Sequence, residues 1–233
     1  MPEAENHSIT APDDRALLAG LRQGQARAYE QMMRRYNRLL YRAARGIVRD
    51  DAEAQDCVQE AWLRAFTGLQ GFRGEAALGT WLTRIVINQA LTQQRRLGRW
   101  VAWNEDFESG ESDMAQYPHG RDAMESPEER VARLQVLRQL EQAIDSLAPI
   151  YRSVFILRAV QGLSVEDTAQ GLQVSADVVK TRFLRARAQL RALLAFDPET
   201  EAAYLHDFAG QRCSDLTGRV LQELRSRGVI RDH

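Results

Sequence analysis

Residues 15–99 of this chain contain no proline, so nothing in this segment prevents long uninterrupted helices. The six prolines are Pro2, Pro12, Pro118, Pro127, Pro149 and Pro198. None of them interrupts residues 15–99, where apolar side chains recur at helical spacing. No convincing run of alternating β-branched residues, the pattern of a strand, is found in the sequence. We therefore predict an all-α protein.

An acidic segment divides the sequence into two helical domains. Residues 104–130 contain nine carboxylates and two arginines, a net charge of −7, which is typical of a flexible linker. The second helical block runs from about Pro127 to Leu194 and is broken at Asp197–Pro198. The predicted organisation is an acidic tail at 1–14, a helical domain at 15–99, an acidic linker at 100–127, a second helical domain at 128–196 and a C-terminal extension at 197–233.

Composition excludes several classes of protein. No stretch approaches the roughly 18 apolar residues that span a bilayer, and the first residues lack the basic and apolar segments of a signal peptide. We therefore expect a cytoplasmic protein with no membrane insertion. Cys57 and Cys213 form no CxxC pair, which argues against a disulfide framework. His206 and Cys213 could offer two metal ligands, but no further pair completes a site, so no metal and no cofactor are expected.

The second domain contains a helix-turn-helix pattern. Ser164 is placed to cap a short helix, with Asp167 three residues later, and Ser175 is placed to cap a second helix that runs to about Leu194. The tight turn between them is residues 171–174. Residues 175–191 contain five basic side chains and one acidic side chain, a net charge of +4. This pattern favours a helix that reads the DNA major groove, and an ordinary αα-hairpin with a solvated arginine face is the alternative.

The periodicity of the second helix separates its two sides. The residues expected to face the core are Val179, Phe183, Ala186 and Leu190. The residues left on or near the open side are Lys180, Thr181, Leu184, Arg185 and Arg187. These open-side residues are the candidates for contact with DNA.

The first domain contains an acidic helix. Residues 50–60 include five carboxylates. Asp56, Gln59 and Glu60 fall at i, i+3 and i+4, and therefore on one helix face. In an isolated helix such a face is most simply a solvated one, and a partner-binding face is the alternative.

A basic segment with aromatic residues follows the acidic helix. Residues 72–100 carry five arginines and one glutamate, a net charge of +4. Aromatic rings among arginines suit single-stranded nucleic acid, because bases stack on the rings while guanidinium groups hold the phosphates. For Trp81 and Ile85 we prefer core packing. Asn88, one turn beyond Arg84, is polar inside an apolar stretch and is the better candidate for reading a base edge.

Three motifs, taken in order, resemble a known protein family. DAEAQDCVQEAW (51–62) resembles the core-polymerase-binding helix of bacterial extracytoplasmic-function (ECF, group IV) sigma factors. TWLTRIVIN (80–88) resembles their −10 promoter helix, and residues 147–190 resemble their −35 helix-turn-helix domain. The ordered set covers roughly residues 28–194 and is far more specific than any one motif. By this resemblance, residues 15–99 are sigma region 2 and residues 128–196 are sigma region 4.

The resemblance implies a function and a set of contacts. The chain would be a non-catalytic subunit that binds core RNA polymerase and directs promoter-specific transcription initiation. Implied contacts to the polymerase β′ clamp helices are Asp56, Gln59 and Glu60. Implied contacts to −10 DNA are Arg73, Arg84, Asn88, Arg95 and Arg96. Implied contacts to −35 DNA are Lys180, Thr181, Leu184, Arg185 and Arg187. The polymerase β flap and an anti-sigma factor are further candidate partners, and the linker would thread the polymerase channel toward the RNA exit.

The sequence departs from the family pattern at a few positions. Leu78 stands where the family usually has an aromatic residue, and Thr92 stands where it usually has an acid. Asp177–Val178 replaces the usual Gly-Thr at the start of the recognition helix, where the carboxylate suits the helix dipole but repels a phosphate. The extension beyond Asp197 is longer than a minimal member needs. Its apolar stripe of Cys213, Leu216, Val220 and Leu224, with Gly228 as a stop, predicts one further amphipathic helix.

Two rival functions account for less of the sequence. A helix-turn-helix regulator that never contacts polymerase would explain residues 162–194, but it would leave the acidic helix and the 80–88 helix without a role. An all-α enzyme is the second rival. Its four histidines lie in the predicted tails and linker, and no HExxH motif or paired carboxylates are present.

Overall fold

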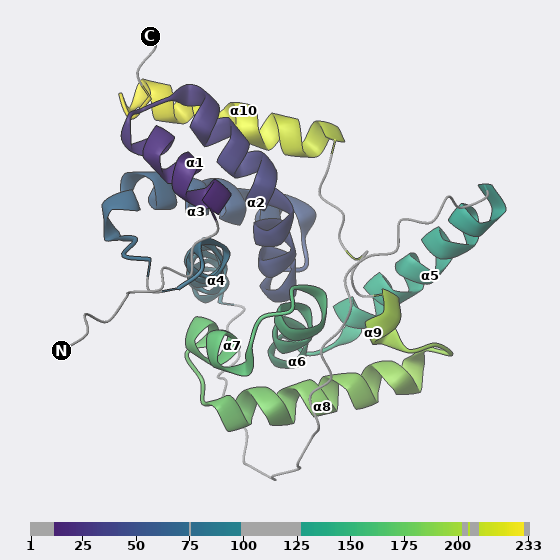
Figure 1. The fold of residues 1–233 in the computed structure, drawn as a ribbon. Coiled ribbons are helices and arrows are strands. Elements are labelled where there is room, and N and C mark those ends of the chain that lie inside the picture. Colours follow the sequence, from purple (N-terminus) through teal and green to yellow (C-terminus); the bar gives the residue numbers. More distant parts are fainter. Residues whose placement is uncertain (1–11, 75, 99–126, 202–204, 206–209, 231–233) are drawn as a thin grey trace.

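The computed structural model describes residues 12–74, 76–98, 127–201, 205 and 210–230 (Figure 1). Within these residues every regular element is a helix, which confirms the all-α prediction. The predicted acidic linker lies outside the described residues except for Pro127, and so do residues 1–11 of the predicted tail and His206.

The helices form two bundles and an extension. The first bundle consists of α1 (Pro12–Arg22), α2 (Ala26–Ile47), α3 (Asp51–Thr67), the 3-10 turn η1 (Leu69–Gly71) and α4 (Leu78–Arg96). The second bundle consists of α5 (Pro127–Ser146), α6 (Pro149–Phe155), the π-helical segment η2 (Ile156–Val160), α7 (Val165–Leu172) and α8 (Ala176–Leu193). The extension holds α9 (Pro198–Glu201) and α10 (Gly210–Ser226).

Helix α1 begins inside the segment that the sequence predicts to be a tail. Asp14 is only 4% exposed. Its carboxylate accepts a hydrogen bond from the Tyr36 hydroxyl at 2.8 Å and pairs with Arg35 at 3.4 Å. Residues 12–14 of the predicted tail are therefore part of α1, because Asp14 has partners on α2 that the sequence pattern does not reveal.

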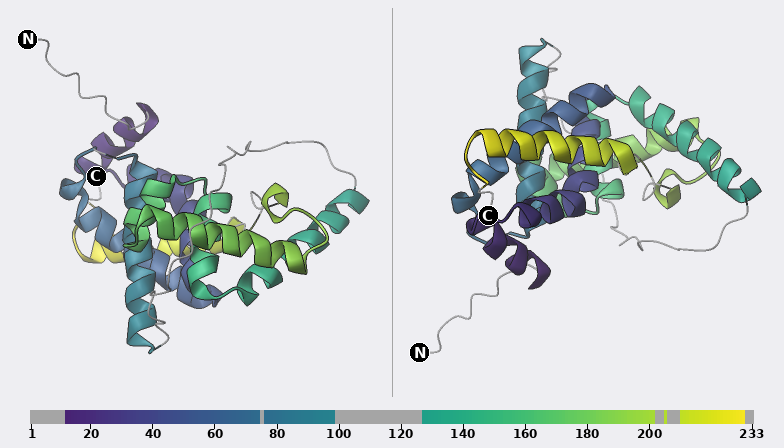
Figure 2. Two further views of the ribbon diagram at one scale, coloured as in Figure 1. Left: turned by 90° about the horizontal axis from the view of Figure 1, so that it is seen from below. Right: turned by 90° about the horizontal axis from the view of Figure 1, so that it is seen from above.

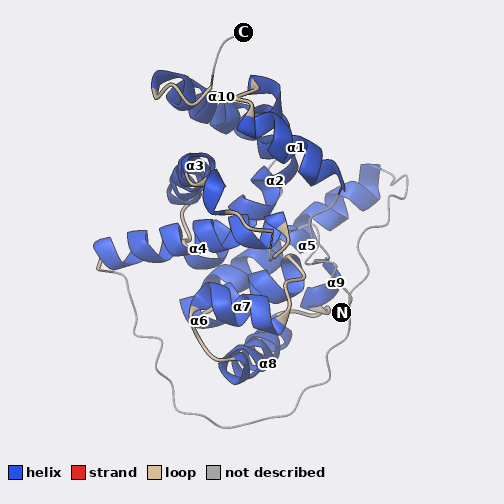
Figure 3. Ribbon diagram, turned by 60° about the vertical axis from the view of Figure 1, so that its left-hand side comes forward, coloured by secondary structure: helices blue, strands red, loops and turns tan. Residues whose placement is uncertain are grey.

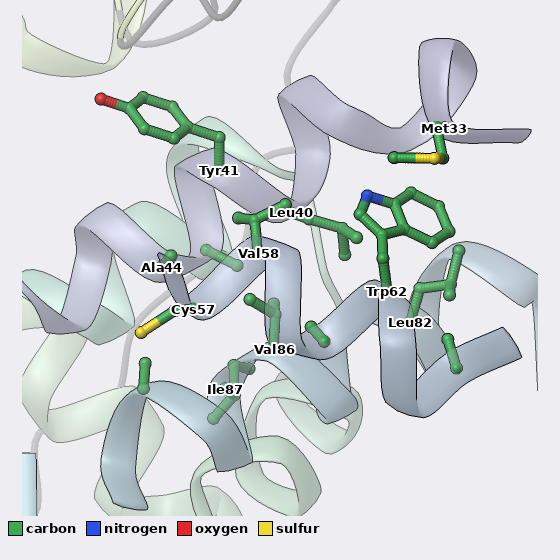
Figure 4. Close-up of a cluster of buried hydrophobic side chains, with 14 of the residues drawn as sticks. Met33, Leu40, Tyr41, Ala44, Cys57, Val58, Trp62, Leu82, Val86 and Ile87 are labelled. Carbon is green, nitrogen blue, oxygen red and sulfur yellow. The ribbon is translucent and has the colours of Figure 1, made fainter. Parts of the chain in front are cut away.

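The core of the first bundle is built around Trp62. Its indole is fully buried and lies between Met33 and Leu40 of α2 and Leu82 of α4 (Figure 4). The ring stacks on Phe66 with 5.0 Å between centroids, so one aromatic pair fills the space between three helices.

Cys57 of α3 is buried in the same core as Trp62. Burial, reinforced by the carboxylates of Asp56 and Glu53, raises the pKa of its thiol to about 12. The thiol therefore stays protonated at neutral pH, as expected for a structural cysteine.

The two bundles lie against each other, with α4 between α3 and α7 (Figures 1 and 3). Arg152 of α6 is 1% exposed, and its guanidinium donates to the Ile47 carbonyl at 2.8 Å and to the Gly46 carbonyl at 3.3 Å. These are the last carbonyls of α2, which would otherwise lack a helical partner. Burial lowers the pKa of Arg152 to about 10, so the side chain remains charged at neutral pH.

The helix-turn-helix has the capping predicted from its sequence. The Ser164 hydroxyl accepts a hydrogen bond from the Asp167 backbone N–H at 2.9 Å, and the Ser175 hydroxyl accepts from the Val178 N–H at 3.3 Å. The turn between α7 and α8 passes through Gln173, whose φ of +58° is in the left-handed region. These caps and this turn set the angle at which α8 leaves α7.

Helix α10 lies on the first bundle, on the side of the molecule opposite to α8 (Figure 2). Its stripe residues Leu216, Val220 and Leu224 are fully buried. Gly228 follows the helix with a φ of +68°, and the Val229 N–H closes the turn on the Leu224 carbonyl. The predicted amphipathic helix and its glycine stop are confirmed.

Candidate functional site

The acidic face of α3 is open to solvent. Asp56 is exposed, and Gln59 and Glu60 are half-buried beside it. Glu60 accepts a hydrogen bond from Arg64, one turn later, at 2.9 Å. The opposite side of α3 carries Trp62 into the core, so the helix presents its polar side chains from a rigid base.

A small cavity with arginine and aromatic walls lies at the start of α4. Its volume is about 340 Å³, and its walls include Phe72, Arg73, Trp81 and Arg84. The Phe72 and Trp81 rings are 5.3 Å apart between centroids and tilted by 53°. Trp81 is only partly buried, so core packing accounts for part of this side chain and the rest borders the cavity. Such a cavity suits a planar base whose phosphate meets a guanidinium.

The remaining predicted −10 residues extend along α4 away from this cavity. Asn88 is exposed one turn beyond Arg84, and its backbone carbonyl accepts a hydrogen bond from the Thr92 hydroxyl at 2.7 Å. Arg95 and Arg96 are exposed in the last turn. One helix therefore carries the amide and the cationic side chains in a row.

The recognition helix α8 keeps its predicted apolar side inside. Val179, Ala186 and Leu190 are fully buried, and Phe183 is half-buried. Lys180 is exposed and lies 3.4 Å from Asp177, while the side chains of Thr181, Leu184 and Arg185 are half-buried.

Arg187 is engaged by the extension. Its guanidinium forms an ion pair with Glu199 of α9 and lies over the Phe183 ring, 5.7 Å from the centroid. The Arg187 side chain is 19% exposed and that of Glu199 is 3% exposed. In this conformation Arg187 is held by its own chain rather than presented outward with Lys180.

Arg84 is engaged in a similar way by the second bundle. Its guanidinium lies 3.3 Å from the carboxylate of Asp167 in the first turn of α7. Close by, Gly171 of α7 is so near to Ile87 of α4 that an added Cβ would stand 3.1 Å from the Ile87 Cδ1 atom. The structure thus brings a predicted −10 arginine together with the helix-turn-helix.

The sequence pattern does not predict Asp167 and Glu199 as partners of Arg84 and Arg187. The sequence pattern predicts only a capping role for Asp167, and it predicts no charge role for Glu199 in the extension. The one signal in the sequence is the position of both carboxylates in or next to the basic helix-turn-helix segment. That signal does not specify which arginine each carboxylate meets, because the contacts join residues far apart in the sequence or across a helix break.

Known proteins share these two bundles. The model of sigma-70 region 2 matches residues 32–100, and that of sigma-70 region 4 matches residues 137–190. The RNA polymerase sigma-H factor of Pseudomonas aeruginosa is 32% identical over 179 residues, which are 77% of this chain and 92% of that protein. The ECF RNA polymerase sigma factor SigM of Mycobacterium tuberculosis is 34% identical over 78% of this chain and 85% of its own length.

The chain belongs to the ECF sigma factors. It is therefore a promoter-specific transcription initiation factor of the sigma-70 type. A solved structure of the sigma factor RpoE in complex with the anti-sigma factor NepR, from Bartonella quintana, matches 79% of this chain and 98% of that chain, at 25% identity and a TM-score of 0.50. The match to region 2 falls in the first bundle, from residue 32 onward, and the match to region 4 falls in the second bundle, from residue 137 onward. Both α9 and α10 lie beyond residue 190, outside the two family models.

Proposed function

We propose that this sigma factor binds core RNA polymerase through the acidic face of α3. The observation that carries this assignment is that Asp56, Gln59 and Glu60 share one accessible face over a fully packed core. The β′ clamp helices are the partner proposed for this face, and the β flap is the partner proposed for the second bundle. Complementary charge steers such an encounter and fixes its register.

The −10 element is read by the first bundle. The cavity beside Trp81 would take one unpaired base, with Arg73 and Arg84 at its rim. Asn88 would contact a neighbouring base edge, and Arg95 and Arg96 would hold backbone phosphates. For Arg84 to do so, its contact with Asp167 has to open.

The −35 element is read by α8. Thr181 and Arg185 are i, i+4 neighbours and can reach adjacent base pairs from one groove, with Leu184 between them. Lys180 is assigned to a phosphate. Asp177, at the start of the same helix, repels a phosphate there, and Asp177→Gly is expected to tighten binding to all promoters alike.

The protein acts as a non-catalytic subunit in the cytoplasm, where the polymerase of a bacterium works. Within the described part of the chain, no helix has the length and apolar character that a membrane crossing requires. An anti-sigma factor is a proposed partner, because the structurally similar RpoE is held by one.

Run-off transcription on genomic fragments tests the proposal. We expect start-site-specific transcripts from core polymerase plus this chain and none from core polymerase alone. A pull-down against core enzyme separates this function from that of a regulator that only binds DNA. Failure to bind core enzyme would contradict the assignment of α3.

A further inference from the structure

The extension is anchored to the first bundle by α10. The buried side chains of Leu216, Val220 and Leu224 join the same core cluster as Met33 and Trp62. A helix with three fully buried apolar side chains is a firm anchor, because burial of apolar surface stabilises the packed state.

A buried amide fixes the register of this anchor. Asn37 of α2 is fully buried, and its Nδ2 donates to the Cys213 Sγ and the Thr217 Oγ1 atoms of α10, both at 3.1 Å. Its Oδ1 accepts a hydrogen bond from the Trp62 indole at 2.7 Å. Because the Nδ2 end donates to two atoms of α10, a shift of α10 along α2 would break the hydrogen bonds of this buried donor.

A charged contact at the start of α10 adds to the anchor. Arg212 donates to the Asp51 carboxylate at 3.0 Å and lies over the Tyr41 ring at 5.2 Å from its centroid. Asp51 is in the first turn of α3, so α10 contacts both α2 and α3.

The other end of the extension is anchored to the second bundle. Leu205 is fully buried in a cluster of second-bundle residues that includes Leu140, Phe155 and Leu190. Glu199 of α9 pairs with Arg187 and lies 3.8 Å from Arg191. The extension therefore crosses from one DNA-binding bundle to the other and is fixed at both ends.

The connection between the two anchors is short. Residues 205 and 210 are joined by five peptide units, which span at most about 18 Å. The −35 and −10 elements are numbered by their distance in base pairs from the transcription start. They are therefore about 25 base pairs apart, which is about 85 Å of B-form DNA. The reach of the chain between the two elements can be taken as the connection plus the full lengths of α4 and α8, which are about 28 and 27 Å. This reach is still shorter than the distance between the two promoter elements.

We propose that the C-terminal extension is an intramolecular latch that holds the second bundle against the first, so that one of its two anchors must release before both promoter elements are bound together. The latch rests on the proposed function, because only two separated DNA elements require the bundles to part. While it is closed, Glu199 occupies Arg187 and the neighbouring bundle occupies Arg84.

Lengthening the connection tests the latch without disturbing either anchor. In the full-length chain, a flexible insert of about 30 Gly/Ser residues is placed between Phe208 and Ala209. The lengthened connection is then about as long as the other covalent connection between the bundles, which is the roughly 30 residues between Arg96 and Pro127. Effective concentration falls as about the −3/2 power of linker length, so the open population rises by about tenfold. The same insert placed after Ile230 lies outside the latch and is the matched control.

Two measurements report the opening. In run-off transcription with core polymerase, the chain concentration for half-maximal product falls by about tenfold, because apparent affinity scales with the fraction of competent conformer. In a Gly171→Cys background, where the thiol faces Ile87 in the closed state, peptide-resolved maleimide labelling of that position accelerates by a similar factor.

The outcomes separate the latch from the proposed function. An unchanged half-maximal concentration together with unchanged labelling would overturn the latch, and so would an equal effect of the control insert. The absence of a core-dependent transcript from the parent and from every insertion variant would contradict the proposed function, whereas accelerated labelling would still support the latch.

Discussion

The face proposed to bind polymerase and the faces proposed to read DNA differ in how accessible their charged side chains are. On α3, Asp56 is exposed, and Glu60 pairs with Arg64 of the same helix. On α4 and α8, Arg84 and Arg187 each meet a carboxylate from another element of the chain. The difference suggests an order of events, in which the isolated chain can meet polymerase at once but must rearrange before it engages both promoter elements.

Charge reversal on α3 should give the largest effect. We expect Asp56→Arg with Glu60→Arg to weaken core binding by about 2–5 kcal/mol, or by roughly thirtyfold or more, because a close interfacial charge pair becomes repulsive. Binding is measured by titration with labelled core enzyme, and helicity by circular dichroism. Glu30→Arg is the matched control, since Glu30 pairs with Arg34 one turn later just as Glu60 pairs with Arg64. Normal binding by the double variant would show that the acidic face is only solvated.

Substitutions on α8 should give the next largest effect and should separate base contacts from phosphate contacts. Arg185→Ala is expected to cost about 1–3 kcal/mol and to relax preference at one −35 position, if it pairs with a guanine edge. Lys180→Ala should instead weaken all promoters alike and lower the salt slope by about one unit. Both variants are measured on one panel of −35 sequences at two salt concentrations. An unchanged panel for Arg185→Ala would mean that this face of α8 does not enter the groove.

Asn88 tests the −10 assignment within the first bundle. Asn88→Ala is expected to reduce the yield of transcript, because the loss of one base contact costs about 1–3 kcal/mol. The affinity for core enzyme should be unchanged. Gln94→Ala, on the same helix, serves as the control. Equal activity of Asn88→Ala and the parent on every mapped promoter would contradict the assignment.

Releasing Arg84 should have a smaller effect of the opposite sign. Asp167→Asn keeps a hydrogen-bonding side chain beside Ser164 but removes the ion pair. Since the Arg84 and Asp167 side chains are 27% and 33% exposed, the pair should contribute no more than about 1 kcal/mol. We therefore expect a two- to fivefold lower half-maximal concentration in transcription, and an increase in that concentration would contradict the masking of Arg84.

The smallest expected effect concerns pH and the α10 anchor. Partial burial would raise the pKa of Asp51, but the Tyr41 hydrogen bond, Arg45 and Arg212 outweigh it and hold the pKa below its ordinary value. A carboxylate with a depressed pKa stabilises the fold above the unfolded pKa of about 3.9, and this contribution is lost as pH falls through the folded pKa. The melting temperature of Asp51→Asn should be slightly below that of the parent at pH 6, and the gap should close below about pH 4. A gap that widens in acid would contradict this contact.

The sequence predicted the helices and their caps more fully than the relation between the bundles. The Ser164 and Ser175 caps and the α10 stripe follow from local spacing, and all three are confirmed. The contact of Arg152 with the end of α2 joins residues more than a hundred positions apart, and no periodicity encodes such a pairing. For the candidate site, residue type and helix face were predictable, whereas the carboxylates that engage Arg84 and Arg187 were not, because those contacts depend on tertiary packing.

The position of Ile230 has a consequence for protein engineering. This residue is buried in the core cluster of the first bundle, and the neighbouring Gly228 and Val229 line one cavity together with Leu21 and Gly24 at the end of α1. A truncation that removes Ile230 would therefore uncover apolar surface of that core. A tag or fused domain joined beyond Ile230 through a flexible spacer would leave the core covered.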